Sequence, residues 1–279
     1  MNGILYIIAT PIGNLDDITY RAVRLLKEVD LIAAEDTRHS LKLLNHLGIS
    51  KKMISLHEHN EVDRVESMLS HLQEGKDVAL ISDAGTPLIS DPGYHLVTAA
   101  RQHGIQVSPI PGVSSIIAAL SCAGLPTNEF LYIGFLSQKN QERLNRLHSF
   151  KNSSRTIVLL ESTHRLIRLL EQISETLPDA NVVIAKELTK AYERFISGTA
   201  LECLAVFEKD ERLVKGEFVV MLHQQVTEDI ETSMLEIENT LLLLLDEMPL
   251  KKAVSITVKL TGQKKNIVYQ KALDLKESD

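Results

Sequence analysis

Short apolar runs alternate with amphipathic stretches along the first 124 residues of the chain. The runs at Ile4–Thr10, Leu31–Ala34 and Val78–Ser82 lack a strict apolar–polar alternation, which is typical of strands covered on both faces. Polar turn residues follow each run, and apolar residues then recur at helical spacing, as they do from Val62 to Gln73. This repetition of strand and helix predicts an α/β fold built on a mainly parallel sheet.

The same pattern resumes after a turn-rich segment at residues 124–128, which is typical of a domain linker. From residue 227 the pattern is almost entirely helical, with a break at Pro249 and a turn at Gly262. We expect two α/β domains with mainly parallel sheets, at residues 1–124 and 125–226, and a small helical C-terminal region at residues 227–279. The strands expected in the second domain are Phe130–Phe135, Thr156–Leu160, Val182–Lys186 and Phe218–Leu222, with a hairpin-like excursion at Arg194–Gly198.

The composition disfavours a general nucleic-acid-binding protein. The net charge is −7, aromatic residues make up 4% of the chain and tryptophan is absent, whereas phosphate contacts need clustered Lys and Arg and base stacking needs aromatic rings. Any RNA contact would be local, at two basic segments that are alternatively just solvated helix faces. The basic residues are Lys139, Arg143, Arg146, Lys151 and Arg155 in the first segment, and Lys251, Lys252, Lys259, Lys264, Lys265, Lys271 and Lys276 in the second.

The cysteines and the absence of several sequence motifs exclude further classes of protein. Cys122 and Cys203 stand apart in apolar runs, which indicates buried, reduced thiols. The N-terminus has no basic segment of the signal-peptide kind, and Leu241–Leu245 is too short to span a bilayer, so we expect a cytoplasmic protein without membrane contact. Metal-ligand spacings are absent, so we expect no metal. The sequence also lacks a glycine-rich dinucleotide fingerprint, a P-loop and a nucleophile elbow, which disfavours the enzyme classes that carry these motifs.

Polar segments directly follow several expected strands. Asp83–Pro87 and Pro111–Ser115 offer small residues, main-chain N–H groups and hydroxyls, and three more segments are strongly charged or polar, at residues 35–38, 57–60 and 186–190. Each segment alone is also compatible with an ordinary turn, helix cap or solvated strand end. Because the carboxyl ends of parallel strands share one edge, together they predict a ligand site there.

The order of these segments along the chain resembles that of one known family. The matching segments are Ala9–Leu15, Ala34–Arg38, Leu56–Asn60, Ser82–Tyr94, Pro111-Gly112, Gly134–Leu136, Glu161–Arg165, Lys186–Lys190 and Gly216-Glu217. They resemble the bacterial 16S rRNA (cytidine-2′-O)-methyltransferases of the tetrapyrrole-methylase superfamily, over about residues 4–223 and more loosely into the tail. Thr163 stands where the family has Pro, Lys186 where it usually has Arg, and residues 113–115 read Val-Ser-Ser where it usually has Pro-Ser-Ala.

The resemblance implies a homodimer that binds S-adenosylmethionine (SAM) folded in a cleft between two domains. It implies that the enzyme methylates the ribose 2′-hydroxyl of a cytidine in the decoding region of 16S rRNA, presented by the small ribosomal subunit. From their place after strands and in the matched segments, we expect the cofactor to be bound, mostly through main chain, by Asp83, Ala84, Gly85, Thr86, Pro87, Pro111, Gly112, Ser114, Ser115, Glu161 and Leu188.

On the same grounds, other residues are expected to face the nucleotide. We expect the substrate to contact Pro11, Gly13, Asn14, Arg38, His57, Asn60, Arg165 and Lys186, and we assign catalytic roles to Asp36, Glu58, His59 and Glu187. The proton acceptor remains open among Glu58, Glu187 and a histidine, and Glu35 or Asp36 is alternatively structural. Two other functions stay open: a methylase of a tetrapyrrole or another non-RNA substrate on the same fold, and a non-catalytic ribosome-binding module.

Overall fold

The computed structural model describes residues 1–225 and 230–277. The chain divides into two compact units, Met1–Gln224 and Gln225–Asp279, and each is described by itself. The boundary expected between residues 226 and 227 lies outside the described residues.

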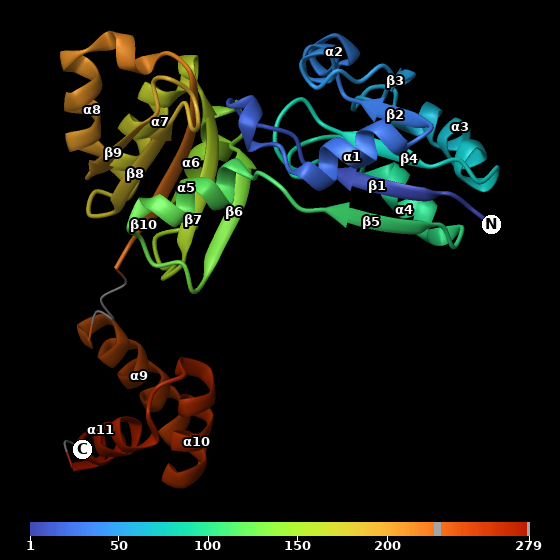
Figure 1. The fold of residues 1–279 in the computed structure, drawn as a ribbon. Helices are drawn as coiled ribbons and strands as arrows, with labels where there is room; N and C mark the ends of the chain where they lie inside the picture. The colour runs from blue at the N-terminus through green and yellow to red at the C-terminus, as the bar shows by residue number, and fades with distance from the viewer. Residues whose placement is uncertain (226–229, 278–279) are drawn as a thin grey trace. The chain divides into compact units, whose positions relative to one another are not determined.

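The first sheet of the larger unit is entirely parallel, as the sequence predicts (Figure 1). Its strand order is β3-β2-β4-β1-β5. The strands are β1 (Ile4–Ile8), β2 (Leu31–Ala34), β3 (Met53–Ser55), β4 (Val78–Ile81) and β5 (Gln106–Ile110). All residues of β2 and β4 are buried, which explains why these runs are apolar without alternation.

Helices cover both faces of this sheet. Helices α1 (Tyr20–Glu28) and α2 (Thr37–His46) pack on one face around Ile8 and Ile32, and α3 (Glu61–Gln73) and α4 (Tyr94–Gln102) pack on the other around Leu5 and Leu80. A short 3-10 helix, η1, spans Leu15–Asp17. This layering leaves the carboxyl edge of the sheet for the loops that follow the strands.

The second sheet is mixed, and here the expectation of a mainly parallel sheet is wrong. Its order is β6-β7-β10-β8-β9, and of its four neighbouring pairs only β6–β7 is parallel. The last strand of the unit enters the middle of the sheet antiparallel to both neighbours. An apolar run records that a strand is buried but not its direction, so the pattern could not reveal this. The strands are β6 (Phe130–Phe135), β7 (Thr156–Ser162), β8 (Asn181–Lys186), β9 (Arg194–Gly198) and β10 (Glu217–His223).

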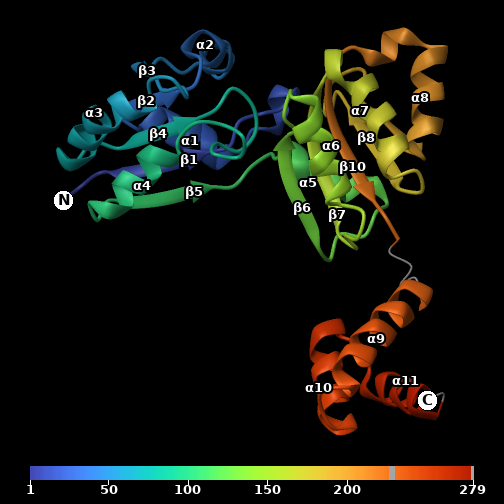
Figure 2. The same cartoon turned by 180° about the vertical axis from the view of Figure 1, so that it is seen from behind.

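Helix α5 (Ser115–Ala123) follows the first sheet in sequence but packs on the second. Its Ile116 and Leu120 share a core with Val158 and Met221, although a division at residue 124 would assign the helix to the first domain. Residues 111–114, between β5 and α5, therefore connect the part of the chain that packs on the first sheet to the part that packs on the second (Figure 2). The opposite face of the second sheet carries α6 (Asn140–His148), α7 (Thr163–Thr176), α8 (Ala200–Lys209) and the 3-10 helix η2 (Glu211–Val214). Cys122 of α5 is exposed, contrary to expectation, whereas Cys203 is buried.

The smaller unit is helical, as predicted. It contains α9 (Ile230–Leu245), α10 (Leu250–Thr261) and α11 (Lys265–Glu277), whose core includes Ile237, Leu241 and Val254. Pro249 precedes α10, where its missing N–H costs no helix hydrogen bond, and Gly262 ends α10 in a left-handed conformation (φ 70°). In the described parts of the chain, no helix combines the length and apolarity that crossing a membrane requires.

Candidate functional site

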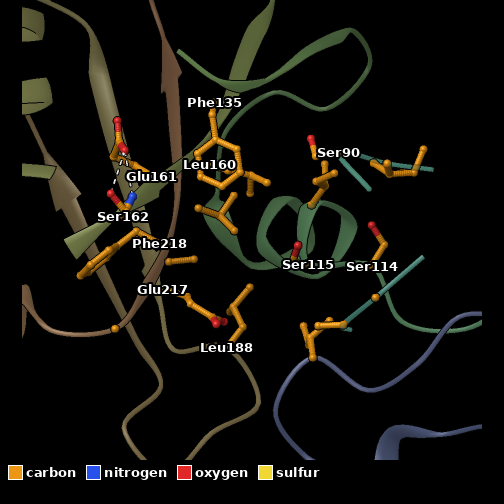
Figure 3. A pocket seen from close by; sticks show the side chains of 18 of the residues that line it. Ser90, Ser114, Ser115, Phe135, Leu160, Glu161, Ser162, Leu188, Glu217 and Phe218 are labelled. Atoms are coloured by element: carbon orange, nitrogen blue, oxygen red, sulfur yellow. Dashed lines mark hydrogen bonds between the residues drawn. The ribbon is translucent and has the colours of Figure 1, made fainter. Parts of the chain in front are cut away.

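A cavity of about 480 Å³ lies where the carboxyl edge of the first sheet meets the second sheet (Figure 3). Its walls come from loops after β1 and β4, from the start of α5, and from β7, β10 and the turn after β8. The lining residues are Ile12, Ala84, Gly85, Thr86, Ile89, Ser90, Asp91, Ser114, Ser115, Ile116, Phe135, Leu160, Glu161, Ser162, Thr163, His164, Ala185, Leu188, Gly216, Glu217, Phe218 and Val219.

Short hydrogen bonds tie the first-sheet loops together at this cavity. Thr10 and Gly85 exchange two main-chain hydrogen bonds of 2.8 and 2.9 Å, and the Thr86 hydroxyl donates to the Val113 carbonyl at 3.0 Å. Gly85 has φ +80°, and a Cβ at this position would stand 3.4 Å from Ile12 Cγ2. Glycine therefore suits this turn both by its backbone conformation and by the space left beside Ile12.

One turn on the cavity wall is strained and fastened to the second sheet. Leu88 (φ 72°) and Ser90 (φ 69°) adopt left-handed conformations that L side chains rarely take. The hydroxyls of Ser90 and Tyr132, in β6, are 2.6 Å apart. Gly93 ends the turn with φ 126° and abuts Leu80. Such strain persists only where surrounding contacts hold it, and it concentrates at functional sites.

A second turn repeats this arrangement on the other side of the cavity. Glu187 (φ 50°) and Thr189 (φ 63°) are also left-handed, and the Thr189 hydroxyl accepts a 3.1 Å hydrogen bond from Asn14 N. Gly13 packs closely against this turn, because a Cβ there would stand 2.5 Å from Lys190 Cγ. The two halves of the larger unit are thus joined by one hydrogen bond from each strained turn.

Asp91 is a cavity residue to which we assigned no role from the sequence. The pKa of its carboxyl group is raised to about 6, chiefly by burial and also by the nearby carboxylates of Glu35 and Asp83, although a hydrogen bond with the Ser82 side chain lowers it. Burial likewise raises the pKa of Glu35. The signal that could have identified Asp91 was its segment, Ser82–Tyr94, which belongs to the matched pattern, but Asp91 does not directly follow a strand.

A smaller hollow of about 230 Å³ lies on the other side of the same loops. Pro11 and Asp83 line it, whereas their chain neighbours Ile12 and Ala84 line the larger cavity. Its remaining walls are Leu15, His39, Ser40, Lys42, Leu43 and Ser82. The Asp83 carboxylate accepts a 3.1 Å hydrogen bond from Asp36 N, which connects the loop after β4 to the loop after β2.

Comparison with known proteins connects this architecture to methyl transfer. Residues 4–203 match the family model Tetrapyrrole (Corrin/Porphyrin) Methylases, and residues 231–276 match the RsmI C-terminal HTH domain. Over 275 residues the chain is 48% identical to "Ribosomal RNA small subunit methyltransferase I" of Escherichia coli O157:H7, covering 98% of this chain and 95% of that protein. The chain belongs to the tetrapyrrole methylase family. A protein of the same printed name from Pseudomonas aeruginosa is 46% identical over 97% of each chain.

Solved structures of tetrapyrrole methylases and related enzymes share the fold. Diphthine synthase has a TM-score of 0.63 at 16% identity, with 80% of this chain and 90% of that chain covered. Cobalt precorrin-4 methyltransferase has a TM-score of 0.57 at 20% identity, with 78% and 94% covered. Uroporphyrin-III C-methyltransferase from Thermus thermophilus, solved with S-adenosylhomocysteine, has a TM-score of 0.54 at 19% identity, with 78% and 97% covered. SAM is the cofactor of this methylase family.

Most segments expected to hold the cofactor of this methylase do meet at the large cavity. Of the residues expected there, Ala84, Gly85, Thr86, Ser114, Ser115, Glu161 and Leu188 line it, whereas Asp83, Pro87, Pro111 and Gly112 do not. Several lining positions went unassigned although they lie in the matched segments, among them Ile12, Ile89, Ser90, Asp91, Phe135, Ser162, Thr163, His164, Gly216 and Glu217.

The Glu161 side chain faces away from the pocket of the methylase. On β7 it follows the alternation of Ile157 and Leu159, which belong to the core under α7, and its side chain is fully buried. One carboxylate oxygen lies 3.2 Å from Arg165 Nε and accepts a hydrogen bond from Ser162 N. Arg165, expected to contact substrate, also donates to the Leu136 carbonyl and therefore holds α7 in place.

Two basic residues that were expected to contact RNA are buried in this methylase. Lys186 is 5% exposed in β8, and Arg143 of the first basic segment is 2% exposed. Lys139 and Arg155 of that segment are paired with Glu142 and Glu129. These positions do not form a free basic surface.

The carboxylates of Asp36 and Glu187 both form hydrogen bonds that stabilise the local structure. Asp36 caps α2, and hydrogen bonds from Arg38 lower the pKa of its exposed carboxyl to about 2. Burial of Glu187 would raise the pKa of its carboxyl, but hydrogen bonds from Glu217 N and Lys190 outweigh this effect and lower it. A carboxylate that holds its charge so firmly is a weak proton acceptor.

The segment at residues 57–60 follows β3, at the edge of the sheet far from β1 and β5. Asn60 closes this loop by accepting a hydrogen bond from His57 N and donating one to the Ser55 carbonyl. Glu58 and His59 are exposed, and neither hollow is lined by any residue of the segment. Within residues 1–225 and 230–277, no three His, Cys, Asp or Glu residues form a group that could hold a metal ion.

Proposed function

We propose that this protein transfers the methyl group of SAM to the ribose 2′-hydroxyl of a cytidine in the decoding region of 16S rRNA, within the small ribosomal subunit. The observation that supports it most is 48% identity, over nearly the whole of both chains, to a protein named for methylation of small-subunit rRNA. The cavity at the junction of the two sheets supplies a place for the donor.

The cavity suits SAM in size and chemistry. Its volume of about 480 Å³ falls in the usual range for sites that enclose a small molecule. Main chain at residues 84–86 can approach the donor closely, because Ala84 and Gly85 carry little or no side chain. Ser114 and Ser115 stand at the start of α5, where unpaired N–H groups favour a carboxylate such as that of the methionine part. Ile12, Leu160 and Leu188 offer apolar walls.

SAM supplies an activated methyl group on sulfur. The task of the chain is to hold the hydroxyl oxygen in line with that methyl carbon, and such positioning contributes roughly 7–11 kcal/mol to catalysis in general. The two turns that fasten the halves together keep the walls in register. The chain must also provide a group that takes the hydroxyl proton.

We assign the rRNA to the carboxyl edge of the first sheet. The strand order places the loops after β3, β2, β4 and β1 side by side, and strands about 4.8 Å apart give a row roughly 14 Å long. This row contains His57–Asn60, Asp36–Arg38, Asp83 and Pro11–Asn14. Glu58 and His59, at its far end, are proposed to contact nucleotides beside the target and not the reacting hydroxyl.

The helical unit and a second subunit complete the proposal. Lys251, Lys252, Lys259, Lys264 and Lys265 are exposed on α10 and at the start of α11, and we propose that they contact ribosomal phosphates. The side chain of Lys276 lies outside the described residues. We also propose that the enzyme is a homodimer, and sedimentation of the purified protein at the mass of one chain would contradict this.

The deciding experiment supplies labelled SAM to small subunits from cells that lack this enzyme and maps the modified nucleotide. The expected result is one methyl group on one cytidine ribose of the decoding region. Label on a base, or on a non-RNA substrate such as a tetrapyrrole and not on the subunit, would contradict the proposal. Binding of subunits without SAM binding or transfer would indicate a non-catalytic ribosome-binding module.

A further inference from the structure

Four residues that line the donor cavity have titratable side chains, and these side chains differ in their burial and in whether they form an ion pair. Glu161 is buried on the far face of β7 against Arg165. Glu217 is 79% exposed and pairs with Lys190 Nζ at 3.0 Å. His164 is exposed at the start of α7. Asp91 is half-buried and takes part in none of the ion pairs found among the described residues.

Asp91 also stands between the donor cavity and the proposed RNA edge. It lines the cavity, and its surroundings include the Ser82 hydroxyl at the end of β4 and the carboxylates of Glu35 and Asp83 at the ends of β2 and β4. In the second sheet, burial raises the pKa of the Tyr132 hydroxyl, and the nearby charge of Asp91 adds to this rise.

The turn that carries Asp91 is held in one conformation. Leu88 and Ser90 are left-handed, Ser90 is anchored to Tyr132, and Gly93 packs so closely on Leu80 that a Cβ there would stand 2.6 Å away. A turn fastened at both ends fixes the position of the carboxylate, as proton transfer in a transition state requires.

We propose that the Asp91 carboxylate takes the proton from the sugar hydroxyl as that hydroxyl is methylated. This inference rests on the proposed function and names the proton acceptor that the function requires. In the step, the hydroxyl oxygen forms a bond to the methyl carbon while the carbon–sulfur bond breaks. The sulfur keeps that electron pair as a neutral thioether, and the hydroxyl proton passes to Asp91, which releases it to water.

The electrostatics suit this role. Burial and the carboxylates of Glu35 and Asp83 raise the pKa of Asp91 to about 6, so the group is ionised at neutral pH yet more basic than an ordinary aspartate. The charged or titratable groups around it are Glu35, Asp83 and Tyr132. By contrast, Arg38 holds the pKa of Asp36 at about 2.

The test compares wild type with Asp91→Asn in single-turnover transfer to unmethylated small subunits at saturating SAM. The wild-type rate is expected to rise with pH through about pH 6 and then level off, because the carboxyl must be ionised. Asp91→Asn is expected to lower the rate about 10²–10⁴-fold near neutral pH and to abolish this rise, with SAM affinity by calorimetry unchanged within about threefold. Asp179→Asn, at an exposed turn outside the site, serves as the control.

A second readout needs neither donor nor substrate. Because the folded-state pKa of Asp91 lies above the ordinary value of 3.8, ionising it opposes folding, and this cost is full above about pH 6 and vanishes as pH falls through 3.8. Asp91→Asn is therefore expected to melt at a higher temperature than wild type near neutral pH, with a gap that narrows toward pH 4.

Three outcomes would overturn the assignment. The first is transfer by Asp91→Asn within about threefold of wild type. The second is a rise with pH that persists in Asp91→Asn and disappears in His164→Gln, which would make the histidine the acceptor. The third is a loss of SAM affinity above about tenfold with the saturated rate unchanged, which would make Asp91 a donor ligand. A wild-type enzyme that methylates no subunit would instead overturn the proposed function and this inference with it.

Discussion

The two sheets present different ends of their strands to the cavity. In the first sheet every strand is parallel, so only loops that follow strands reach the shared edge. In the second sheet β10 is antiparallel, and its start pairs with the ends of β7 and β8, since Phe218 stands opposite both Glu161 and Lys186. Gly216 and Glu217, which precede or begin a strand, thereby reach the same cavity as loops that follow strands.

The sheets also contribute different chemistry. The first brings the carboxylate of Asp91, which forms no ion pair within the described part of the chain, beside Glu35 and Asp83. The carboxylates of the second are paired, Glu161 with Arg165 and Glu217 with Lys190. We infer that the first sheet carries the reaction and that the second supplies walls and main-chain contacts.

The largest expected effect comes from filling the first-sheet side of the cavity. Gly85→Val forces a β-branched residue into φ +80° and places its side chain toward Ile12. We expect SAM affinity to fall at least about 100-fold, as measured by calorimetry. Gly48→Ala is the control, because it also has a left-handed backbone (φ +65°) but has nothing within 4 Å and lies outside the cavity. Equal loss of SAM affinity in both variants would show a general effect of strain.

An intermediate effect is expected from the second sheet, on stability and not on binding. Glu161→Gln removes the charge that faces Arg165 in a buried position, which we expect to cost about 1–3 kcal/mol in the free energy of unfolding. SAM affinity should stay within about threefold of wild type, because the side chain points away from the donor. Denaturant titration and calorimetry measure the two quantities. A loss of SAM affinity with an unchanged free energy of unfolding would instead show that the Glu161 carboxylate contacts the donor.

The smallest effects are expected from the two hydrogen bonds that join the halves. Tyr132→Phe and Thr189→Val each remove one, at about 0.5–1.5 kcal/mol of unfolding free energy. SAM affinity should fall about two- to fivefold in each, because the walls are held less firmly. Tyr192→Phe, at a position 78% exposed, is the matched control for the tyrosine. Unchanged affinity in both variants would show that neither turn fastens the donor site.

Much of the donor cavity followed from the order of segments along the chain. Ala84–Thr86 and Ser114-Ser115 were predicted because loops that follow the strands of a parallel sheet share one edge, and both segments line the cavity. Asp91 was missed because a left-handed turn carries it back to the cavity several residues after β4 has ended. The Glu161 side chain could not be placed, because sequence alone does not tell which face of β7 meets the donor.

The sequence by itself determined approximately where strands and helices lie, to within about two residues at their ends, since apolar spacing, glycine and proline act on a few neighbouring residues. It also determined the parallel first sheet, because each strand there is followed by a helix that returns the chain to the same edge. Only the tertiary structure decided that β10 runs against its neighbours, that α5 packs on the second sheet, and that Asp91 adjoins Glu35 and Asp83. These features depend on pairing between segments distant in the chain, and local patterns of apolar and polar residues carry no record of such pairing.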